Sequence, residues 1–510
     1  MAAGAGAALA HPPFGILPGL LGYPLLMWLV DRAGAARPIR SSFLMGWLAG
    51  LAFFAISLWW VAEAFYVDAE NQGWMAPFAV LFLATGLALF WGAAAALYRT
   101  FAATGARRVL LFAGLLAAFE WLRGHVLTGL PWDLPGETWR AGSAPSQAAS
   151  LVGVYALSWI TLAAVSVLAV AREGRAGLAA AVAGVAAIAG LYGFGAWRLA
   201  HAAPLAANAS WIRIVQADVK QESKYDQRIF DNIFARYIAL TRAPADRPAD
   251  IVVWPEGAIP AALDEYLAPG AWTRDEIVST LRPGQTLLVG GYRFAQRRGG
   301  EVAFNSLVAV RRTGAELVVT ALYDKYRLVP FGEFLPLDGL LSPLGVKQMV
   351  HVGDGFAPGP RPRPIVSPGA PPVQPLICYE SLFPGFTREG ARASGIAPAW
   401  IVNVSNDAWF GATSGPWQHL NIASYRAIEE GVPMARATPT GVSAMIDAYG
   451  RVLPGKLLGH AKYGVIDAPL PPALAATPYR RWGDLPFLVM LLISLFGTSV
   501  PWRATLRRNG

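Results

Sequence analysis

The sequence predicts two kinds of structure in one chain: a bundle of seven or eight membrane-spanning helices, and an α/β domain outside the membrane. The chain has 510 residues, of which 55% are hydrophobic and 15% are charged, whereas soluble domains carry about 25% charged residues. Apolar runs of about 20 residues, the length that crosses a bilayer, fill most of residues 1–204 and recur after residue 470. Residues 205–470 instead alternate short β-branched runs with amphipathic stretches. This composition excludes a purely soluble protein, and its high hydrophobicity excludes a disordered one.

Seven segments have the composition of membrane spans: Phe14–Val30, Phe43–Trp60, Ala76–Leu97, Val109–Trp121, Ala148–Val170, Gly177–Trp197 and Leu485–Val500. The segment Ala2–Ala10 is apolar but short, and it consists mostly of Ala and Gly. It is either a frayed terminus or part of an eighth span. We therefore expect residues 1–204 to form the helical bundle, and residues 471–510 to form a last membrane helix with a cytoplasmic tail.

The loops between these spans differ in charge, and this difference predicts the orientation of the chain. The loops after the first, third and fifth spans contain several arginines, whereas the loop after the second contains Glu63, Asp68 and Glu70 and no Lys or Arg. Because basic residues stay in the cytoplasm, residues 205–470 should lie on the outer, periplasmic face. The formal net charge of +9 then reflects cytoplasmic loops, and we expect no nucleic-acid partner because no basic stripe is present.

Residues 205–470 have the pattern of an α/β domain, in which mostly buried strands alternate with helices. The expected strands are Trp211–Val219, Asp250–Trp254, Thr286–Val289, Ser306–Val310, Leu317–Leu322, Pro375–Cys378, Trp400–Val404 and Val442–Asp447, and the expected helices are Tyr225–Leu240 and Trp417–Glu430.

Three short motifs stand where predicted strands end, the place where sites gather in α/β sheets. They contain Glu256 after Asp250–Trp254, Lys325 after Leu317–Leu322, and Cys378 at the end of Pro375–Cys378. A thiol attacks as its thiolate, a carboxylate can accept the thiol proton, and a fixed cation can stabilise an oxyanion. These three groups together are what acyl transfer through a thioester requires.

Each of these residues also has a purely structural explanation. Cys378 could be a buried small hydrophobic residue, Glu256 a turn residue, and Lys325 a surface charge paired with Glu333. Lysine is rare here, with six in the chain, and it is a compact charge whose pKa shifts readily on burial, which favours a function for Lys325. One cysteine and six scattered histidines make no metal-ligand pattern, so we expect neither a metal nor another cofactor.

The order of the Glu, Lys and Cys motifs resembles the nitrilase (carbon–nitrogen hydrolase) superfamily, and the flanking spans narrow the resemblance to the apolipoprotein N-acyltransferase family. The matching pieces are Glu120–Gly124, Leu127–Trp132, Pro330–Glu333, Cys378–Glu380, Ser405–Gly411 and Gly415–His419. The resemblance extends over essentially the whole chain. It implies a nitrilase-like, four-layer α-β-β-α sandwich for residues 205–470.

The resemblance also implies roles at the matching positions. Glu256 would be the general base, Lys325 would stabilise the oxyanion, and Cys378 would be the nucleophile. Glu333, Tyr379 and Glu380 would support the pocket. Tyr225 stands where the family usually has a tryptophan, so an aromatic surface is kept without the indole N–H.

The function implied by the resemblance is ping-pong acyl transfer, the last step of bacterial lipoprotein maturation. A fatty acyl chain, expected from the sn-1 position of phosphatidylethanolamine, would pass through a Cys378 thioester to the α-amino group of an S-diacylglyceryl-cysteine. The partners would be a phospholipid acyl donor and a diacylated apolipoprotein acceptor. The protein would be a multi-pass monomer of the bacterial inner membrane.

Other interpretations stay open at this point. A membrane-anchored nitrilase-type amidase would pass the thioester to water, and the three motifs alone do not separate transfer from hydrolysis. A transporter or scaffold is less consistent with the sequence, because Asp31 and Glu120 lie near span ends rather than mid-membrane. The apolar stretch Leu337–Val352 is either a lid that touches the bilayer or a packed edge. Trp409–His419 either lines the site of the acceptor amine or packs in the core.

Overall fold

The computed structural model describes residues 1–34, 36–101, 103–221, 229–298, 300–342 and 355–499, and they form two compact units. The helical unit contains Met1–Trp59, Pro77–His201 and the chain from Arg481 onward, and the α/β unit contains Trp60–Ala76 and Ala202–Arg480. Tyr225 and most of the stretch Leu337–Val352 lie outside the described residues.

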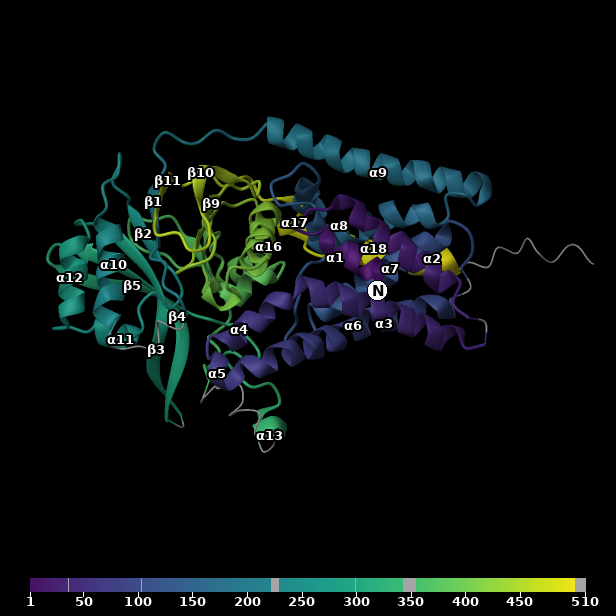
Figure 1. Ribbon diagram of the computed structural model, residues 1–510. Helices are drawn as coiled ribbons and strands as arrows, with labels where there is room; N and C mark the ends of the chain where they lie inside the picture. The colour runs from purple at the N-terminus through teal and green to yellow at the C-terminus, as the bar shows by residue number, and fades with distance from the viewer. Residues whose placement is uncertain (35, 102, 222–228, 299, 343–354, 500–510) are drawn as a thin grey trace, which may run out of the picture. The chain divides into compact units, whose positions relative to one another are not determined.

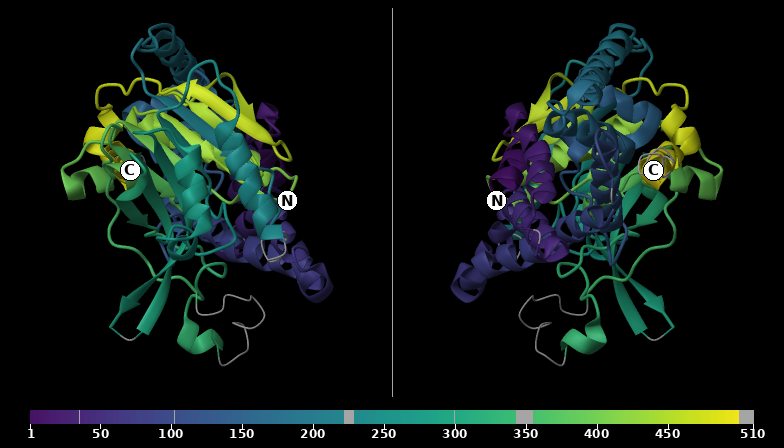
Figure 2. Two further views of the ribbon diagram at one scale, coloured as in Figure 1. Left: turned by 90° about the vertical axis from the view of Figure 1, so that its left-hand side faces the viewer. Right: turned by 90° about the vertical axis from the view of Figure 1, so that its right-hand side faces the viewer.

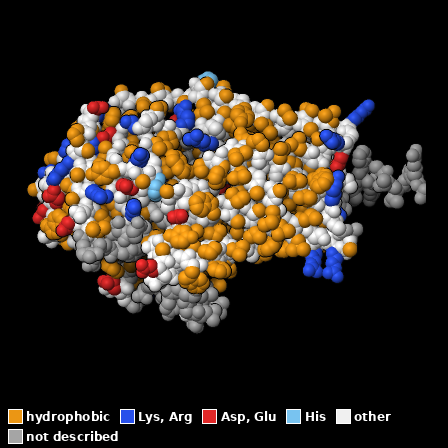
Figure 3. All heavy atoms as spheres, in the orientation of Figure 1, with side chains coloured by type: hydrophobic (Ala, Val, Ile, Leu, Met, Phe, Trp, Pro, Cys, Tyr) orange, Lys and Arg blue, Asp and Glu red, His pale blue; other side chains and the backbone are white. Residues whose placement is uncertain are grey.

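Apolar helices build the helical unit (Figure 1). Among the described residues, four helical stretches are long and apolar enough to cross a membrane: Pro38–Ser57, Ala69–Thr100, Pro145–Ala169 and Gly174–Ala200. Leu17–Asp31 and Leu485–Phe496 are shorter apolar helices. Hydrophobic side chains cover most of the drawn face of this unit (Figure 3), as lipid contact requires. The total of seven or eight spans stays a prediction. The main helices are α1 (Ala2–Leu9), α2 (Gly22–Asp31), α3 (Pro38–Ser57), α6 (Ala76–Thr100), α7 (Arg107–Arg123), α8 (Ala149–Ser166), α9 (Gly174–Ala200) and α18 (Leu485–Ser499).

The structure of Ala2–Ala10 decides against one of the two predictions made for this segment, a frayed terminus or part of an eighth span. The segment is not a frayed terminus, because it forms a regular helix whose Ala3, Ala7 and Ala8 are buried. Its eight residues extend only about 12 Å, which is well short of the roughly 30 Å hydrocarbon core. Small residues allow its close packing: a Cβ on Gly4 would lie 1.7 Å from the Ala49 carbonyl oxygen of α3.

The stretch that follows α7 has little regular structure although it lies inside the helical unit. Its backbone is supported by Arg123, which donates to the carbonyl oxygens of Leu130 and Trp132 and forms a buried ion pair with Glu120. Trp91 of α6 donates from its indole nitrogen to the same carboxylate at 2.6 Å. Non-helical backbone at membrane depth is tolerated only where protein groups satisfy its hydrogen bonds. The Glu120–Gly124 motif is therefore a structural anchor for this stretch.

Two mixed sheets form the centre of the α/β unit. The strand orders are β11-β1-β2-β3-β4-β5 and β10-β9-β8-β7-β6. Strands β1, β2 and β3 are parallel to one another, as are β6, β7 and β8, and the remaining pairs are antiparallel. The strands are β1 (Trp211–Gln216), β2 (Ile251–Trp254), β3 (Thr286–Arg297), β4 (Gly300–Thr313), β5 (Glu316–Asp324), β6 (Val373–Ile377), β7 (Trp400–Val404), β8 (Met434–Ala437), β9 (Ser443–Ile446), β10 (Val452–Leu458) and β11 (Gly464–Pro469).

Each predicted strand corresponds to an observed one, but the sequence analysis did not predict β8, β10 and β11, and it predicted β3 and β4 too short. Strands β3 and β4 form a long hairpin whose far end extends away from the sheet (Figure 2). Side chains there are largely exposed, so no hydrophobic alternation marks them. Strand β8 contains Arg436, and β10 contains Pro454 and Gly455 with an irregular register, which hides both from a pattern search.

The two sheets pack face to face with helices outside them, in the order α, β, β, α (Figure 1). Ile214 of β1 and Val253 of β2 share one core with Val402 of β7 and Met445 of β9. On the other face of the first sheet, a second core includes Ile233 of α10. Helix α16 lies against the second sheet, where its His419 contacts Arg436 of β8. The main helices are α10 (Phe230–Arg242), α12 (Trp272–Thr280), α15 (Phe386–Ser394) and α16 (Gly415–Glu430), and the short ones are α4 (Glu63–Tyr66), α5 (Ala69–Gln72), α11 (Leu263–Tyr266), α13 (Asp338–Leu341) and α17 (Pro478–Trp482).

Candidate active site

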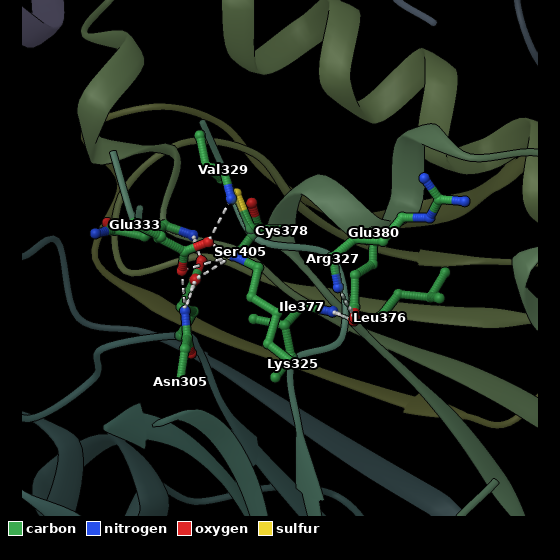
Figure 4. Close-up of polar contacts among 12 residues, drawn as sticks. Asn305, Lys325, Arg327, Val329, Glu333, Leu376, Ile377, Cys378, Glu380 and Ser405 are labelled. Carbon is green, nitrogen blue, oxygen red and sulfur yellow. Dashed lines mark hydrogen bonds and ion pairs between the residues drawn. The ribbon is translucent and has the colours of Figure 1, made fainter. Parts of the chain in front are cut away.

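The three motif residues come from strand ends of both sheets. Glu256 follows β2, Lys325 is the first residue after β5, and Cys378 is the first residue after β6. The Glu256 turn lies tightly against β3, since a Cβ on Gly290 would be 2.8 Å from the Glu256 Cα. Because the two sheets pack face to face, these strand ends meet: Lys325 and Cys378 lie together in Figure 4, and Glu256 is 3.3 Å from Lys325.

Lys325 lies at the centre of a buried charge cluster. Its side chain is 1% exposed, and its Nζ is 3.3 Å from Glu256 Oε1 and 2.9 Å from Glu333. Burial opposes the charge of Lys325, but the two carboxylates outweigh it and raise the pKa of the ammonium above its ordinary value. The structural alternative of a surface lysine is therefore wrong, and Lys325 is a fixed buried cation.

Asn305 of β4 joins the two carboxylates, and the sequence analysis did not single it out. Its Nδ2 donates to Glu256 Oε1 at 2.7 Å and to Glu333 Oε1 at 2.6 Å. The backbone adds two donors: Asn406 N–H to Glu256 Oε2 at 2.7 Å and Val329 N–H to Glu333 Oε2 at 2.8 Å. A polar residue within the apolar run of β4 is the signal that could have identified Asn305.

Cys378 occupies a strained position at the tip of the strand–turn junction. Its φ is +47°, a left-handed conformation that costs a residue with a side chain roughly 1–2 kcal/mol. The residue is only partly buried. Burial and the negative charge of Glu256 raise the pKa of the thiol to about 12, whereas Lys325 and a hydrogen bond with Ser405 act in the opposite direction. At rest the sulfur is therefore a protonated thiol, beside both a carboxylate and an ammonium.

Glu380 holds the turn together from behind. Its Oε2 accepts the Ile377 N–H at 2.8 Å, and its Oε1 accepts the Tyr323 hydroxyl at 2.8 Å and the Tyr326 N–H at 2.7 Å. Burial raises the pKa of this carboxyl to about 7, although these donors oppose the shift. Glu380 thus ties the end of β5 to the end of β6, the two strands that carry Lys325 and Cys378.

The residues expected to support the pocket are not equivalent in the structure. Glu333 belongs to the Lys325 cluster, whereas Glu380 lies behind the turn. The Tyr379 ring is buried and packs edge-on against Phe383, with ring centroids 5.1 Å apart. Tyr225 lies outside the described residues. A thiol, a carboxylate and an ammonium therefore lie together at these strand ends, and groups of these three kinds can support nucleophilic acyl chemistry.

Two family models match the chain. The model described as "Carbon-nitrogen hydrolase" matches residues 212–479, and the model described as "Apolipoprotein N-acyltransferase N-terminal domain" matches residues 3–168.

Similar proteins of full length bear the same name. The chain is 56% identical to an apolipoprotein N-acyltransferase from Caulobacter vibrioides over 96% of this chain and 92% of that protein. It is 38% identical to one from Bradyrhizobium diazoefficiens over 97% of this chain and 92% of that protein. Among solved structures, a variant of a Nesterenkonia amidase of the nitrilase superfamily matches 55% of this chain and 96% of its own, at 18% identity and a TM-score of 0.36.

Proposed function

The chain belongs to the apolipoprotein N-acyltransferase family, a family of enzymes with a carbon–nitrogen hydrolase domain, and on that premise we propose that Cys378 carries the acyl group as a thioester in a ping-pong reaction. The donor is a phospholipid, with the sn-1 chain of phosphatidylethanolamine as the expected group. The acceptor is the α-amino group of the S-diacylglyceryl-cysteine at the start of an apolipoprotein.

In the first half-reaction, Glu256 takes the proton of the Cys378 thiol and the sulfur attacks the carbonyl carbon of the donor ester. Lys325 and the backbone N–H of Tyr379 stabilise the oxyanion of the tetrahedral intermediate. The bond between the carbonyl carbon and the glycerol oxygen then breaks. Glu256 returns its proton to that oxygen, and a lysophospholipid leaves.

In the second half-reaction, the acceptor nitrogen attacks the thioester carbonyl carbon. Its proton passes to Glu256, the carbon–sulfur bond breaks, and the sulfur takes the proton back from Glu256. The product is an amide, which is more stable than the ester that was consumed, so the reaction needs no nucleotide.

The observation that carries this proposal is the buried Lys325 beside Glu256 and Cys378. A cation that is 1% exposed and held by two carboxylates is a costly arrangement for stability alone, since well-packed apolar residues often serve as well. It is useful where negative charge develops on a neighbouring atom. Glu333 and Asn305 then serve to fix Lys325 and Glu256, and Glu380 fixes the turn of Cys378.

The proposal also includes the setting of the enzyme. We place it in the bacterial inner membrane as a multi-pass monomer, with residues 1–204 and 471–510 as membrane segments and residues 205–470 in the periplasm. Both substrates are lipids, so an enzyme with several apolar helices suits them better than one with a single anchor. The lid at Leu337–Val352 and the lining of the amine site by Trp409–His419 stay predictions.

Intact-mass analysis of the purified protein tests the acyl-enzyme directly. After incubation with phosphatidylethanolamine in mixed micelles, we expect one acyl adduct. It should be absent from Cys378→Ala, and because the chain has one cysteine the site is unambiguous. A diacylated lipopeptide should discharge the adduct much faster than water does.

The other outcomes separate the alternatives. Fast discharge by water, with no gain from the lipopeptide, would identify a membrane-anchored amidase-like hydrolase. If the Cys378→Ala variant acylates the lipopeptide as well as the parent protein does, the thioester is refuted and this mechanism with it.

A further inference from the structure

A second polar cluster lies directly behind the turn of Cys378, and the reaction described above does not use it. It consists of Ser381 after Cys378, Asp407 after β7, His419 on α16 and Arg436 on β8. All four are buried, with at most 1% of each residue exposed. Arg436 Nη2 donates to both oxygens of Asp407, at 2.9 and 2.8 Å. Buried polar groups of this kind are costly unless they are fully hydrogen-bonded.

The cluster ends on the carbonyl oxygen of Cys378. Ser381 Oγ donates to this oxygen at 2.8 Å, and His419 Nε2 lies 2.9 Å from Ser381 Oγ. The His419 ring also lies within hydrogen-bond reach of the Cys378 carbonyl. Ser381 and His419 thus contact the carbonyl oxygen of the Cys378–Tyr379 peptide group from behind the turn.

The His419 ring is held from its other nitrogen. Nδ1 lies 3.2 Å from Asp407 Oδ1 and 3.1 Å from Arg436 Nη2, and Nη2 directs its two protons at the two Asp407 oxygens. Burial and the charge of Arg436 lower the pKa of His419, whereas Asp407 opposes this shift. The Asp407–Arg436 pair therefore fixes the ring so that Nε2 faces Ser381 Oγ.

Holding this carbonyl also fixes the N–H of the next residue. A trans peptide group is planar, and its C=O and N–H point in opposite directions. The Cys378 carbonyl and the Tyr379 N–H belong to one such group. Donation to the carbonyl from behind therefore directs the Tyr379 N–H forward, and it also polarises the amide and strengthens that donor. The left-handed φ of +47° at Cys378 gives the turn a strained geometry that only surrounding contacts can maintain.

We propose that His419 and Ser381 are positioning residues for the oxyanion hole: they hold the Cys378–Tyr379 peptide so that the Tyr379 N–H faces the developing oxyanion. Arg436 and Asp407 hold the His419 ring in place against Ser381. The inference rests on the proposed function, because it needs an oxyanion formed by attack of Cys378.

Two reactions of the same sulfur separate this role from a general structural one. Attack on a phospholipid ester passes through an oxyanion, whereas alkylation of Cys378 by iodoacetamide needs a thiolate and no oxyanion hole. The variants are His419→Gln, whose amide nitrogen can take the place of Nε2, His419→Asn, whose amide nitrogen can take the place of Nδ1, and Ser381→Ala. Ser424→Ala is the matched control, because it removes a buried hydroxyl that donates within its own helix, to the Leu420 carbonyl.

Complete loss of one oxyanion donor costs about 10²- to 10³-fold in kcat, so we expect a misdirected donor to cost roughly 10- to 100-fold. His419→Asn and Ser381→Ala should lose that much in the rate of acyl-enzyme formation, with little change in KM. His419→Gln should retain most of the rate, and Ser424→Ala should behave as the parent. Alkylation of Cys378 should change by less than about threefold in all of them, and melting temperatures in detergent identify any variant that does not fold.

Equal acylation rates in all variants, or a parallel loss of acylation and alkylation, would overturn the inference. If His419→Asn does not fold, Ser381→Ala decides the matter by the same two measurements. A parent protein that forms no acyl-enzyme would instead refute the proposed function, so the two failures are distinguishable.

Discussion

Replacing Lys325 by methionine tests whether this residue is the cation that holds the active-site carboxylates together. Methionine keeps most of the side-chain volume and removes the charge. Glu256 and Glu333 would then remain buried, bridged by Asn305 Nδ2 at 2.7 and 2.6 Å and without the ammonium at 3.3 and 2.9 Å. We expect the variant to be markedly less stable and to form no acyl-enzyme.

The magnitude follows from Coulomb's law. The Oε1 atoms of Glu256 and Glu333 share the Asn305 nitrogen at 2.7 and 2.6 Å, and two unit charges about 5 Å apart repel each other by roughly 3 kcal/mol at an effective dielectric constant of about 20. Removing one partner of a buried ion pair typically costs about 3–5 kcal/mol. A domain of this size loses about 2–4 °C in Tm per kcal/mol, so the Tm should fall by about 10 °C at pH 8.

Thermal unfolding of the full-length protein in detergent at pH 8 measures this loss of stability. Lys462→Met is a suitable control, because Lys462 is exposed and its removal should change the Tm by less than about 2 °C. A Lys325→Met variant as stable as the parent at pH 8 would refute the electrostatic reasoning.

Three further predictions concern the same structure. Because the pKa of the Cys378 thiol is about 12, alkylation by iodoacetamide at pH 7.5 should be more than about a hundredfold slower than that of free cysteine and should rise with pH up to 10; a plateau below pH 8 would contradict this. Gly290→Ala would place a Cβ 2.8 Å from the Glu256 Cα and should slow acyl-enzyme formation at least about tenfold in a folded protein, which intact mass measures. Arg123→Leu leaves the buried Glu120 carboxylate without its cation and with the Trp91 N–H still bound, and it should destabilise the helical unit by about 3–5 kcal/mol. The double variant Arg123→Leu with Glu120→Gln should recover part of the loss in the same melting assay.

The sequence predicted the chemical groups of the site because each stands at a strand end and belongs to a short motif. Glu256, Lys325 and Cys378 meet as expected from strand ends of two packed sheets, and Glu333 joins them from the segment after β5. Such motifs consist of neighbouring residues, so they can be recognised from the sequence alone. The chain's single cysteine and its few lysines made two of these positions conspicuous.

The residues that support the site, such as Asn305 and Arg436, could not be predicted in this way because their partners are distant in the sequence. Asn305 contacts two carboxylates that are 49 and 28 residues away in the sequence. Arg436 interrupts the pattern of β8, and its partner Asp407 lies 29 residues before it. A buried arginine in a strand becomes reasonable only when the acid that neutralises it is known. For the same reason, His419 was predicted only as part of a segment with two alternative roles.

The high pKa of Cys378 is compatible with its proposed role because of where the proton goes. Losing the proton to solvent would create a partly buried thiolate next to Glu256, and burial, together with repulsion from that carboxylate, raises the pKa to about 12. Passing the proton to Glu256 instead moves one negative charge from the carboxylate to the sulfur and leaves the total charge of the cluster unchanged. Lys325 stays beside that charge, and Glu333 at 2.9 Å keeps it in place after Glu256 has become neutral. In the proposed reaction, Glu333 therefore keeps Lys325 paired during the step in which Glu256 has taken the thiol proton and lost its negative charge.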